Sequence, residues 1–248
     1  MNKYRTLIIS DIHIGSDESK PEELYEFLKE NTSDKLILNG DIIDIKLLNS
    51  ANLGIQNIEL IYDILEINNT EVIYLIGNHD ISLEKYDGFK NENFTIRNNY
   101  EHKGLDEKHY FVCHGHKYIF NNFISNSPFL ERIISQIITL LNHLKKVHSG
   151  HIFKRNKPIK KGLEYYTLAD DSRLFIKKGL KIISRYKKYV KYLCDSINVD
   201  GVICGHIHLP EIKIIKGKIY MNSGDFVENF SALVETHQGE WKIIYKNE

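Results

Sequence analysis

Five short motifs in the sequence combine carboxylates, an amide and imidazoles at spacings that suit metal binding. Side chains two residues apart on an extended segment point to the same side, so an Asp-x-His or His-x-His pair can ligate one ion. Carboxylate and amide oxygens together with imidazole nitrogens suit Mn²⁺, Fe²⁺ or Zn²⁺ rather than Ca²⁺. The motifs are Asp11-Ile12-His13, Gly40-Asp41-Ile42-Ile43-Asp44, Gly77-Asn78-His79-Asp80, His114-Gly115-His116 and Gly205-His206-Ile207-His208.

None of these motifs is specific when it stands alone. An isolated Asp-x-His is more often part of a turn, and a carboxylate after glycine is more often a helix N-cap. The pair His206 and His208 is a stronger signal, because both imidazoles converge on one side of the chain. The prediction of a metal site depends on the combination, in which seven ligand-type side chains follow five successive strand-like runs.

The elements that would position these motifs alternate between strand and helix in the first part of the chain. Aliphatic runs at 7–9, 35–38, 71–76 and 110–113 are typical of strands. The segments 21–30 and 57–67 carry apolar residues at helical spacing. This alternation predicts βαβ units, and loops at the ends of such strands are where α/β proteins build their sites.

Five further strands are expected near the C-terminus, at 201–204, 211–215, 218–222, 231–235 and 241–245, with no helix between them. This pattern favours a second, largely antiparallel sheet. The predicted fold class is α/β, a four-layer αββα sandwich of two facing mixed β-sheets with a helical cap insertion. The predicted domains are a core over 1–120 and 195–248, interrupted by a basic helical cap over 121–194.

The chain is formally neutral, but its charge is unevenly distributed. Residues 145–191 contain 15 Lys or Arg and 3 Asp or Glu, a local charge of +12 that the rest of the chain balances. This cap has three interpretations: a cover for an anionic, partly lipidic substrate, a contact with an anionic membrane surface, or a solvated face.

Composition and cysteine content bound the class of protein. Hydrophobic residues make up 42% and charged residues 27%, which is typical of a globular protein and argues against disorder. The three cysteines, Cys113, Cys194 and Cys204, match neither a disulfide framework nor a zinc ribbon. With a strand-like N-terminus and no apolar run long enough to span a bilayer, we expect a cytoplasmic protein, or one peripheral to the inner face of a membrane.

Taken in order, the five motifs resemble those of the calcineurin-like metallophosphoesterase superfamily over residues 11–208. The resemblance implies a dinuclear centre, most often with Mn²⁺, and Fe²⁺ or Zn²⁺ as alternatives. It implies that a hydroxide bridging the two metal ions attacks the phosphorus of a phosphoester or pyrophosphate. Asp11, His13 and His208 would hold the first ion and Asn78, His114 and His206 the second, with Asp41 as the bridge.

The same resemblance assigns catalytic roles to two neighbours. His79 would donate a proton to the leaving oxygen or stabilise the transition state, and Asp80 would orient His79. Asp44 fits either a hydrogen bond to the site or a structural turn. Substrate contacts are expected from Asn78, His79, Asn122 and His206.

Within the superfamily the chain is most similar to the UDP-2,3-diacylglucosamine pyrophosphohydrolase group of lipid A biosynthesis. The similarity includes residues 201–208, the segment 220–228 and a helical insertion before the last motif. That group implies a phosphate-containing, lipid-linked substrate. His116 and Asn122 stand where the group has acidic residues, and His79 where its best-characterised members have Arg, so the chain departs from the pattern of the group at three positions.

Two other functions remain open on the same motifs. A metal-dependent nuclease or general phosphodiesterase would use the basic segment to follow a phosphate backbone. The chain lacks the long C-terminal extension of the DNA-repair relatives. A non-catalytic scaffold on the same fold would be expected to lack ligands, whereas all seven are present here.

Overall fold

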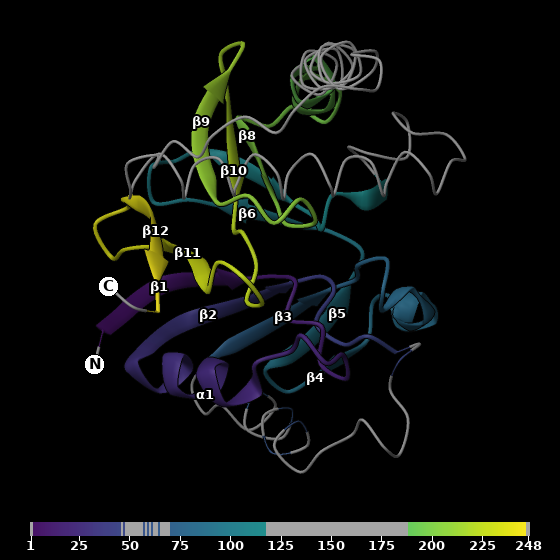
Figure 1. The fold of residues 1–248 in the computed structure, drawn as a ribbon. Helices are drawn as coiled ribbons and strands as arrows, with labels where there is room; N and C mark the ends of the chain where they lie inside the picture. The colour runs from purple at the N-terminus through teal and green to yellow at the C-terminus, as the bar shows by residue number, and fades with distance from the viewer. Residues whose placement is uncertain are drawn as a thin grey trace, which may run out of the picture.

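Two mixed β-sheets form the centre of the protein (Figure 1). The computed structural model describes residues 2–45, 47, 57, 59, 61, 64, 70–117 and 188–246. The seven-stranded sheet has, in spatial order, β12 (Trp241–Tyr245), β11 (Ser231–Glu235), β1 (Asn2–Ile9), β2 (Asn31–Asn39), β3 (Glu71–Leu75), β5 (Phe94–Arg97) and β4 (Lys90–Asn91). The five-stranded sheet has β6 (Tyr100–Lys103), β7 (His109–Val112), β8 (Gly201–Cys204), β10 (Lys218–Asn222) and β9 (Glu211–Ile215).

Both faces of the central strands are apolar, because each sheet is covered on two sides. Leu7 and Ile9 of β1 belong to a buried cluster with Leu24 and Phe27 of α1 (Pro21–Glu30), whereas Ile8 belongs to a cluster between the sheets. This alternation is what a strand with a period of two residues produces when it is buried on both faces.

The layers of the predicted sandwich are visible in the three hydrophobic clusters. One lies between α1 and the seven-stranded sheet, one between the two sheets, and one between the five-stranded sheet and the helical residues 188–196. Val190 and Cys194 of that helix pack with Val202 and Cys204 of β8. The prediction of two facing mixed sheets with helices outside is confirmed.

The prediction of one largely antiparallel C-terminal sheet is wrong in two respects. All five strands form at the predicted bounds, but β11 and β12 join the seven-stranded sheet, and β8 pairs with β10 in parallel. The segment 223–230 carries the chain from one sheet to the other. Local sequence pattern identifies strands but does not choose their partners.

Most of the expected cap, 118–187, lies outside the described residues, so the boundaries of the insertion stay a prediction. Of the helix expected over 57–67, residues 57, 59, 61 and 64 are described and are helical. In the described part of the chain, no helix combines the length and apolarity needed to span a bilayer.

The arrangement of the parallel strands brings the motifs together. In the seven-stranded sheet β1, β2 and β3 run parallel, and in the five-stranded sheet β7 and β8 do. Each of these five strands ends directly before one of the five motifs. Since the carboxyl ends of parallel strands lie along one edge of a sheet, the two sheets present all five loops to the same place.

Candidate metal centre

The candidate ligands lie on backbone that is strained at most of their positions. A left-handed φ costs a residue other than glycine on the order of 1–3 kcal/mol and persists only where the surroundings enforce it. Here backbone hydrogen bonds do so, from Asp11 N to Gly40 O at 3.1 Å and from His13 N to Asp41 O at 3.0 Å. Five of the seven candidates have such a φ: Asp11 (54°), His13 (54°), Asp41 (53°), His206 (68°) and His208 (51°).

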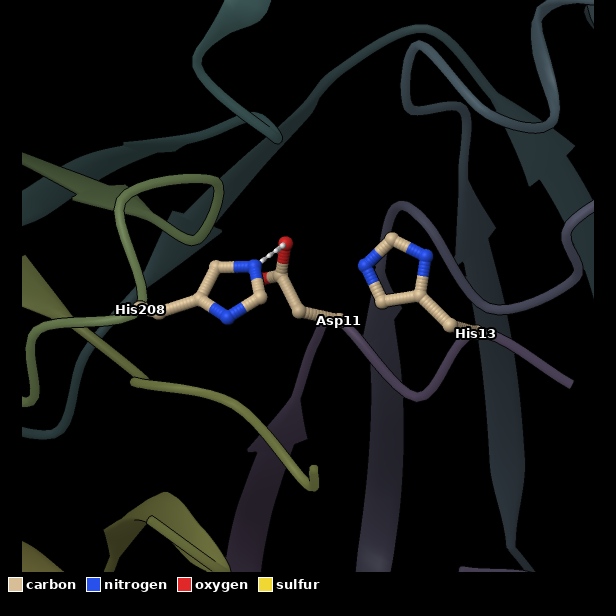
Figure 2. A group of neighbouring side chains, drawn as sticks. All are labelled: Asp11, His13 and His208. Atoms are coloured by element: carbon tan, nitrogen blue, oxygen red, sulfur yellow. Dashed lines mark ion pairs between the residues drawn. The ribbon is translucent and has the colours of Figure 1, made fainter. Parts of the chain in front are cut away.

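The first group of candidate ligands consists of Asp11, His13 and His208, whose ligand atoms lie within 4.8 Å of one another. Asp11 is fully buried, and its Oδ1 lies 3.3 Å from His208 Nε2. Its other oxygen accepts a hydrogen bond from His206 N at 3.0 Å. Figure 2 shows the two imidazole rings flanking the Asp11 carboxylate, an arrangement suited to an ion held by all three side chains.

The second group consists of Asp41, His114 and His206, at the same mutual spacing. Asp41 Oδ2 lies 3.1 Å from His114 Nε2. His114 Nδ1 lies 2.9 Å from Asn39 O, and since a carbonyl can only accept, Nδ1 carries the hydrogen and Nε2 faces the carboxylate. Asp41 also forms a group with His13 and His79, so it lies between the two sets of imidazoles.

Several atoms at this edge are buried without a hydrogen-bond partner. They are Asp11 Oδ1, Asn78 Oδ1 and His114 Nε2, from three different loops; the Asp11 and His114 atoms have only the contacts with His208 and Asp41 given above, which do not have the geometry of a hydrogen bond. Buried polar atoms are nearly always satisfied in folded proteins. All three are donor atoms that a divalent first-row metal prefers, so the residues present fit such an ion.

His79 contacts Asp44 rather than Asp80. Its Nδ1 lies 2.7 Å from Asp44 Oδ2, and the ring is 4.6 Å from the ring of His13. Asp80 is fully buried and accepts hydrogen bonds from Tyr74 Oη at 2.6 Å, Gly77 N at 2.5 Å and Ile42 N at 3.0 Å. The expectation that Asp80 orients His79 is therefore corrected: Asp44 is the carboxylate in contact, and Asp80 braces the loop.

The carboxylates and imidazoles of the candidate site shift one another's pKa values. Burial alone would lower the pKa of His114, but the carboxylates of Asp41 and Asp11 raise it to about 10. Burial also opposes a charge on His208, and Asp11 raises its pKa to about 9. In return, although burial disfavours the carboxylate, His208 and His114 lower the pKa of Asp11 to about 2. The carboxylates thus attract positive charge to this edge.

The order of the motifs and the positions of their side chains agree with a known family. A model of the calcineurin-like phosphoesterase family matches residues 4–210. The chain belongs to this family. Calcineurin-like phosphoesterases are dinuclear metal-dependent hydrolases, and the two groups around Asp11 and Asp41 provide candidate positions for two ions.

Individual relatives of this calcineurin-like phosphoesterase are distant. The UDP-2,3-diacylglucosamine hydrolase of Wigglesworthia glossinidia brevipalpis is 23% identical over 227 residues, which cover 87% of this chain and 84% of that protein. A Vps29 single mutant from Entamoeba histolytica aligns over 96% of both chains at 14% identity, with a TM-score of 0.45. An archaeal phosphodiesterase covers 96% of this chain and 98% of its own, at 15% identity and a TM-score of 0.44.

Two glycines of the phosphoesterase motifs are required by close approach. A Cβ on Gly77 would overlap the backbone nitrogen and a carboxylate oxygen of Asp41. A Cβ on Gly205 would overlap Ser10 Oγ and lie 2.6 Å from Asp11 Oδ2. The loop of one motif thus packs directly on the ligand of another, which explains why glycine precedes Asn78 and His206.

His116 lies at the edge of the second group, with its ring 5.5 Å from that of His114 and 6.4 Å from that of His206. Both of its ring nitrogens are buried without a hydrogen-bond partner. Burial, together with the neighbouring imidazoles of His114 and His206, lowers its pKa to about 3, so the ring is neutral. Asn122, expected to contact substrate, lies outside the described residues.

Proposed function

We propose that this phosphoesterase hydrolyses the pyrophosphate of a lipid-linked nucleotide sugar of the UDP-2,3-diacylglucosamine type, with two Mn²⁺ ions. Asp11, His13 and His208 hold one ion, Asn78, His114 and His206 the other, and Asp41 both. The observation that carries the proposal is that buried ligand-type atoms of Asp11, Asn78 and His114 make no hydrogen bond. The substrate class is supported by the similarity to the Wigglesworthia hydrolase.

The candidate site residues have different roles in the proposed reaction. Two divalent ions supply charge that polarises phosphoryl oxygens and lowers the pKa of a bound water. Asp44 accepts the Nδ1 hydrogen of His79, so in the doubly protonated ring the Nε2–H is the one that would be given to the leaving oxygen, after which the ring is neutral with its hydrogen on Nδ1. The Asp41 carboxylate accepts the His79 backbone N–H at 2.8 Å, so the same residue fixes the metal site and the loop that carries the proton donor.

Binding of Mn²⁺ is expected to release protons. Because the pKa of His114 is about 10 and that of His208 about 9 without metal, both imidazoles are protonated at neutral pH. Each must lose a proton before its Nε2 can ligate, so about two protons should leave near pH 7, and the apparent affinity should rise as pH rises toward 9. Calorimetry of Mn²⁺ binding in buffers of different ionisation enthalpy measures this number, and binding without proton release would contradict the assignment.

A substrate panel tests the proposed function. The Mn²⁺-loaded protein is assayed with UDP-2,3-diacylglucosamine, bis-p-nitrophenyl phosphate and single-stranded DNA. Cleavage of the pyrophosphate with release of UMP and the acylated sugar 1-phosphate is the expected result. Preference for DNA would support the nuclease alternative, and inactivity toward all three with metal bound would support a scaffold.

A further inference from the structure

The last residue of β10 and the loop from β10 to β11 contact two of the segments that carry candidate ligands, the one at Asp11 and the one at 205–208. Asn222 Nδ2 donates to Gly205 O at 2.8 Å, just before His206. Phe226 N donates to Asp11 O at 3.1 Å. Asn229 Nδ2 donates to His208 O at 2.9 Å. The residues 222–229 therefore act as a sixth segment of the site, although they supply none of the candidate ligands.

The buried Asp225 carboxylate holds the conformation of this loop through several hydrogen bonds. Its side chain is fully buried, and Oδ1 accepts the backbone N–H groups of Val227 at 2.9 Å, Glu228 at 2.5 Å and Asn229 at 3.1 Å. Oδ2 accepts a hydrogen bond from the Asn229 amide and lies 3.9 Å from His208 Nδ1. One oxygen thus anchors the carboxylate, and the other faces the imidazole.

His208 is less restrained by burial than Asp11 and His114 are. Its side chain is 34% exposed, whereas those of Asp11 and His114 are fully buried, so packing alone restrains it less. Its backbone is also in the left-handed region, at φ 51°. The hydrogen bond from Asn229 to its carbonyl holds this backbone in place.

The two nitrogens of His208 face two different carboxylates. Nε2 lies 3.3 Å from Asp11 Oδ1, and Nδ1 faces Asp225. At 3.9 Å the contact between Asp225 and Nδ1 is electrostatic and too long for a hydrogen bond. Once His208 has lost one proton, the negative charge beside Nδ1 favours the tautomer with hydrogen on that atom, which leaves the lone pair on Nε2, the nitrogen directed at Asp11.

We propose that Asp225 and Asn229 are positioning residues for His208: Asp225 selects the tautomer and direction of its ring, and Asn229 holds its backbone. The inference rests on the proposed function, because it assigns His208 to a metal ion. Neither residue is itself a ligand, since Asp225 reaches the centre only through His208.

The experiment measures binding of Mn²⁺ alone, by calorimetry and by electron paramagnetic resonance of the coupled ion pair, with wild type and Asp225→Asn. Asparagine keeps Oδ1 for the three backbone donors but places an amide where Oδ2 accepts. We expect the affinity of one of the two ions to fall about 10- to 100-fold, with loss of the coupled signal, while the other ion stays bound. Two ions bound with wild-type affinity would overturn the proposal.

A second test variant and a control variant complete the experiment. Asn229→Ala changes a half-buried side chain and tests the proposal even where Asp225→Asn does not fold; we expect its first-ion affinity to fall about 3- to 10-fold. Unchanged affinity in that variant overturns the proposal. Ser231→Ala removes a hydrogen bond to Ser223 O in the same loop, without contact to His208, and should bind both ions normally.

The results for the variants distinguish a failure of the positioning role from a failure of the proposed function. If Ser231→Ala weakens the same ion as strongly as Asp225→Asn, loop integrity explains the effect and the positioning role is wrong. If wild type binds no Mn²⁺, the proposed function itself fails. If wild type binds two ions and Asp225→Asn also does, only the positioning role fails.

Discussion

Asp41→Asn is expected to lose tight binding of both Mn²⁺ ions and to reduce turnover by at least about a thousandfold. Asp41 is almost fully buried between the two groups of imidazoles, and its Oδ2 lies 3.1 Å from His114 Nε2. Asparagine keeps Oδ1 as the acceptor for the His79 N–H, so the loop geometry survives. The negative charge that the two proposed ions would share does not.

The variant is checked by metal analysis after gel filtration, by turnover of bis-p-nitrophenyl phosphate and by thermal unfolding. Asp34→Asn is the matched control, because Asp34 lies on β2, the strand that precedes Asp41, but is exposed and pairs with Lys3 and His237. It should bind both ions and keep wild-type turnover. Retention of two tightly bound ions in Asp41→Asn would remove Asp41 from the bridging position.

Much of the fold could be predicted because periodicity is local information. The helix 21–30 and the strands 201–204, 211–215 and 218–222 form at their predicted bounds. The parallel strands that precede the motifs were likewise evident as aliphatic runs, since strands buried on both faces are apolar throughout. The order of the motifs then sufficed to place the seven candidate ligands at strand ends.

Three strands escaped prediction for the opposite reason. β4, β5 and β6 are short and partly exposed, and they carry charged residues such as Lys90, Arg97, Glu101 and Lys103. β4 and β6 pair with the strands that follow them, β5 and β7, whereas β5 also depends on β3, which is distant in sequence. The same limit applies to β11, whose place beside β1 depends on a contact between opposite ends of the chain.

The detailed geometry of the site could not be predicted from the sequence either. The left-handed backbone at Asp11, Asp41 and His206 has no signature in residue type, because it is imposed by hydrogen bonds between loops. The partner of His79 could not be chosen between Asp44 and Asp80, which lie 35 residues before it and one residue after it. Proximity in sequence favoured the wrong one.

His79→Asn should keep both metal ions and lose turnover by about 10²- to 10⁴-fold, the usual contribution of a general acid. His79 lies next to the candidate metal ligands, but its Nδ1 contacts Asp44 at 2.7 Å, and its side chain is 39% exposed. Although His79 also lies within ligand distance of His13 and Asp41, we propose that it acts on the substrate, because its side chain is the more exposed one.

The choice of leaving group decides which role His79 performs. A p-nitrophenolate departs without a proton, whereas an alkoxide requires one, so a proton donor should matter far more for alkyl than for p-nitrophenyl phosphodiesters. His79→Asn is therefore expected to lose more activity on the alkyl substrate, and Asp44→Asn, which removes the carboxylate that orients the ring, should show the same bias at smaller size. An equal loss on both substrates would assign His79 to charge stabilisation instead, because that contribution does not depend on the basicity of the departing oxygen.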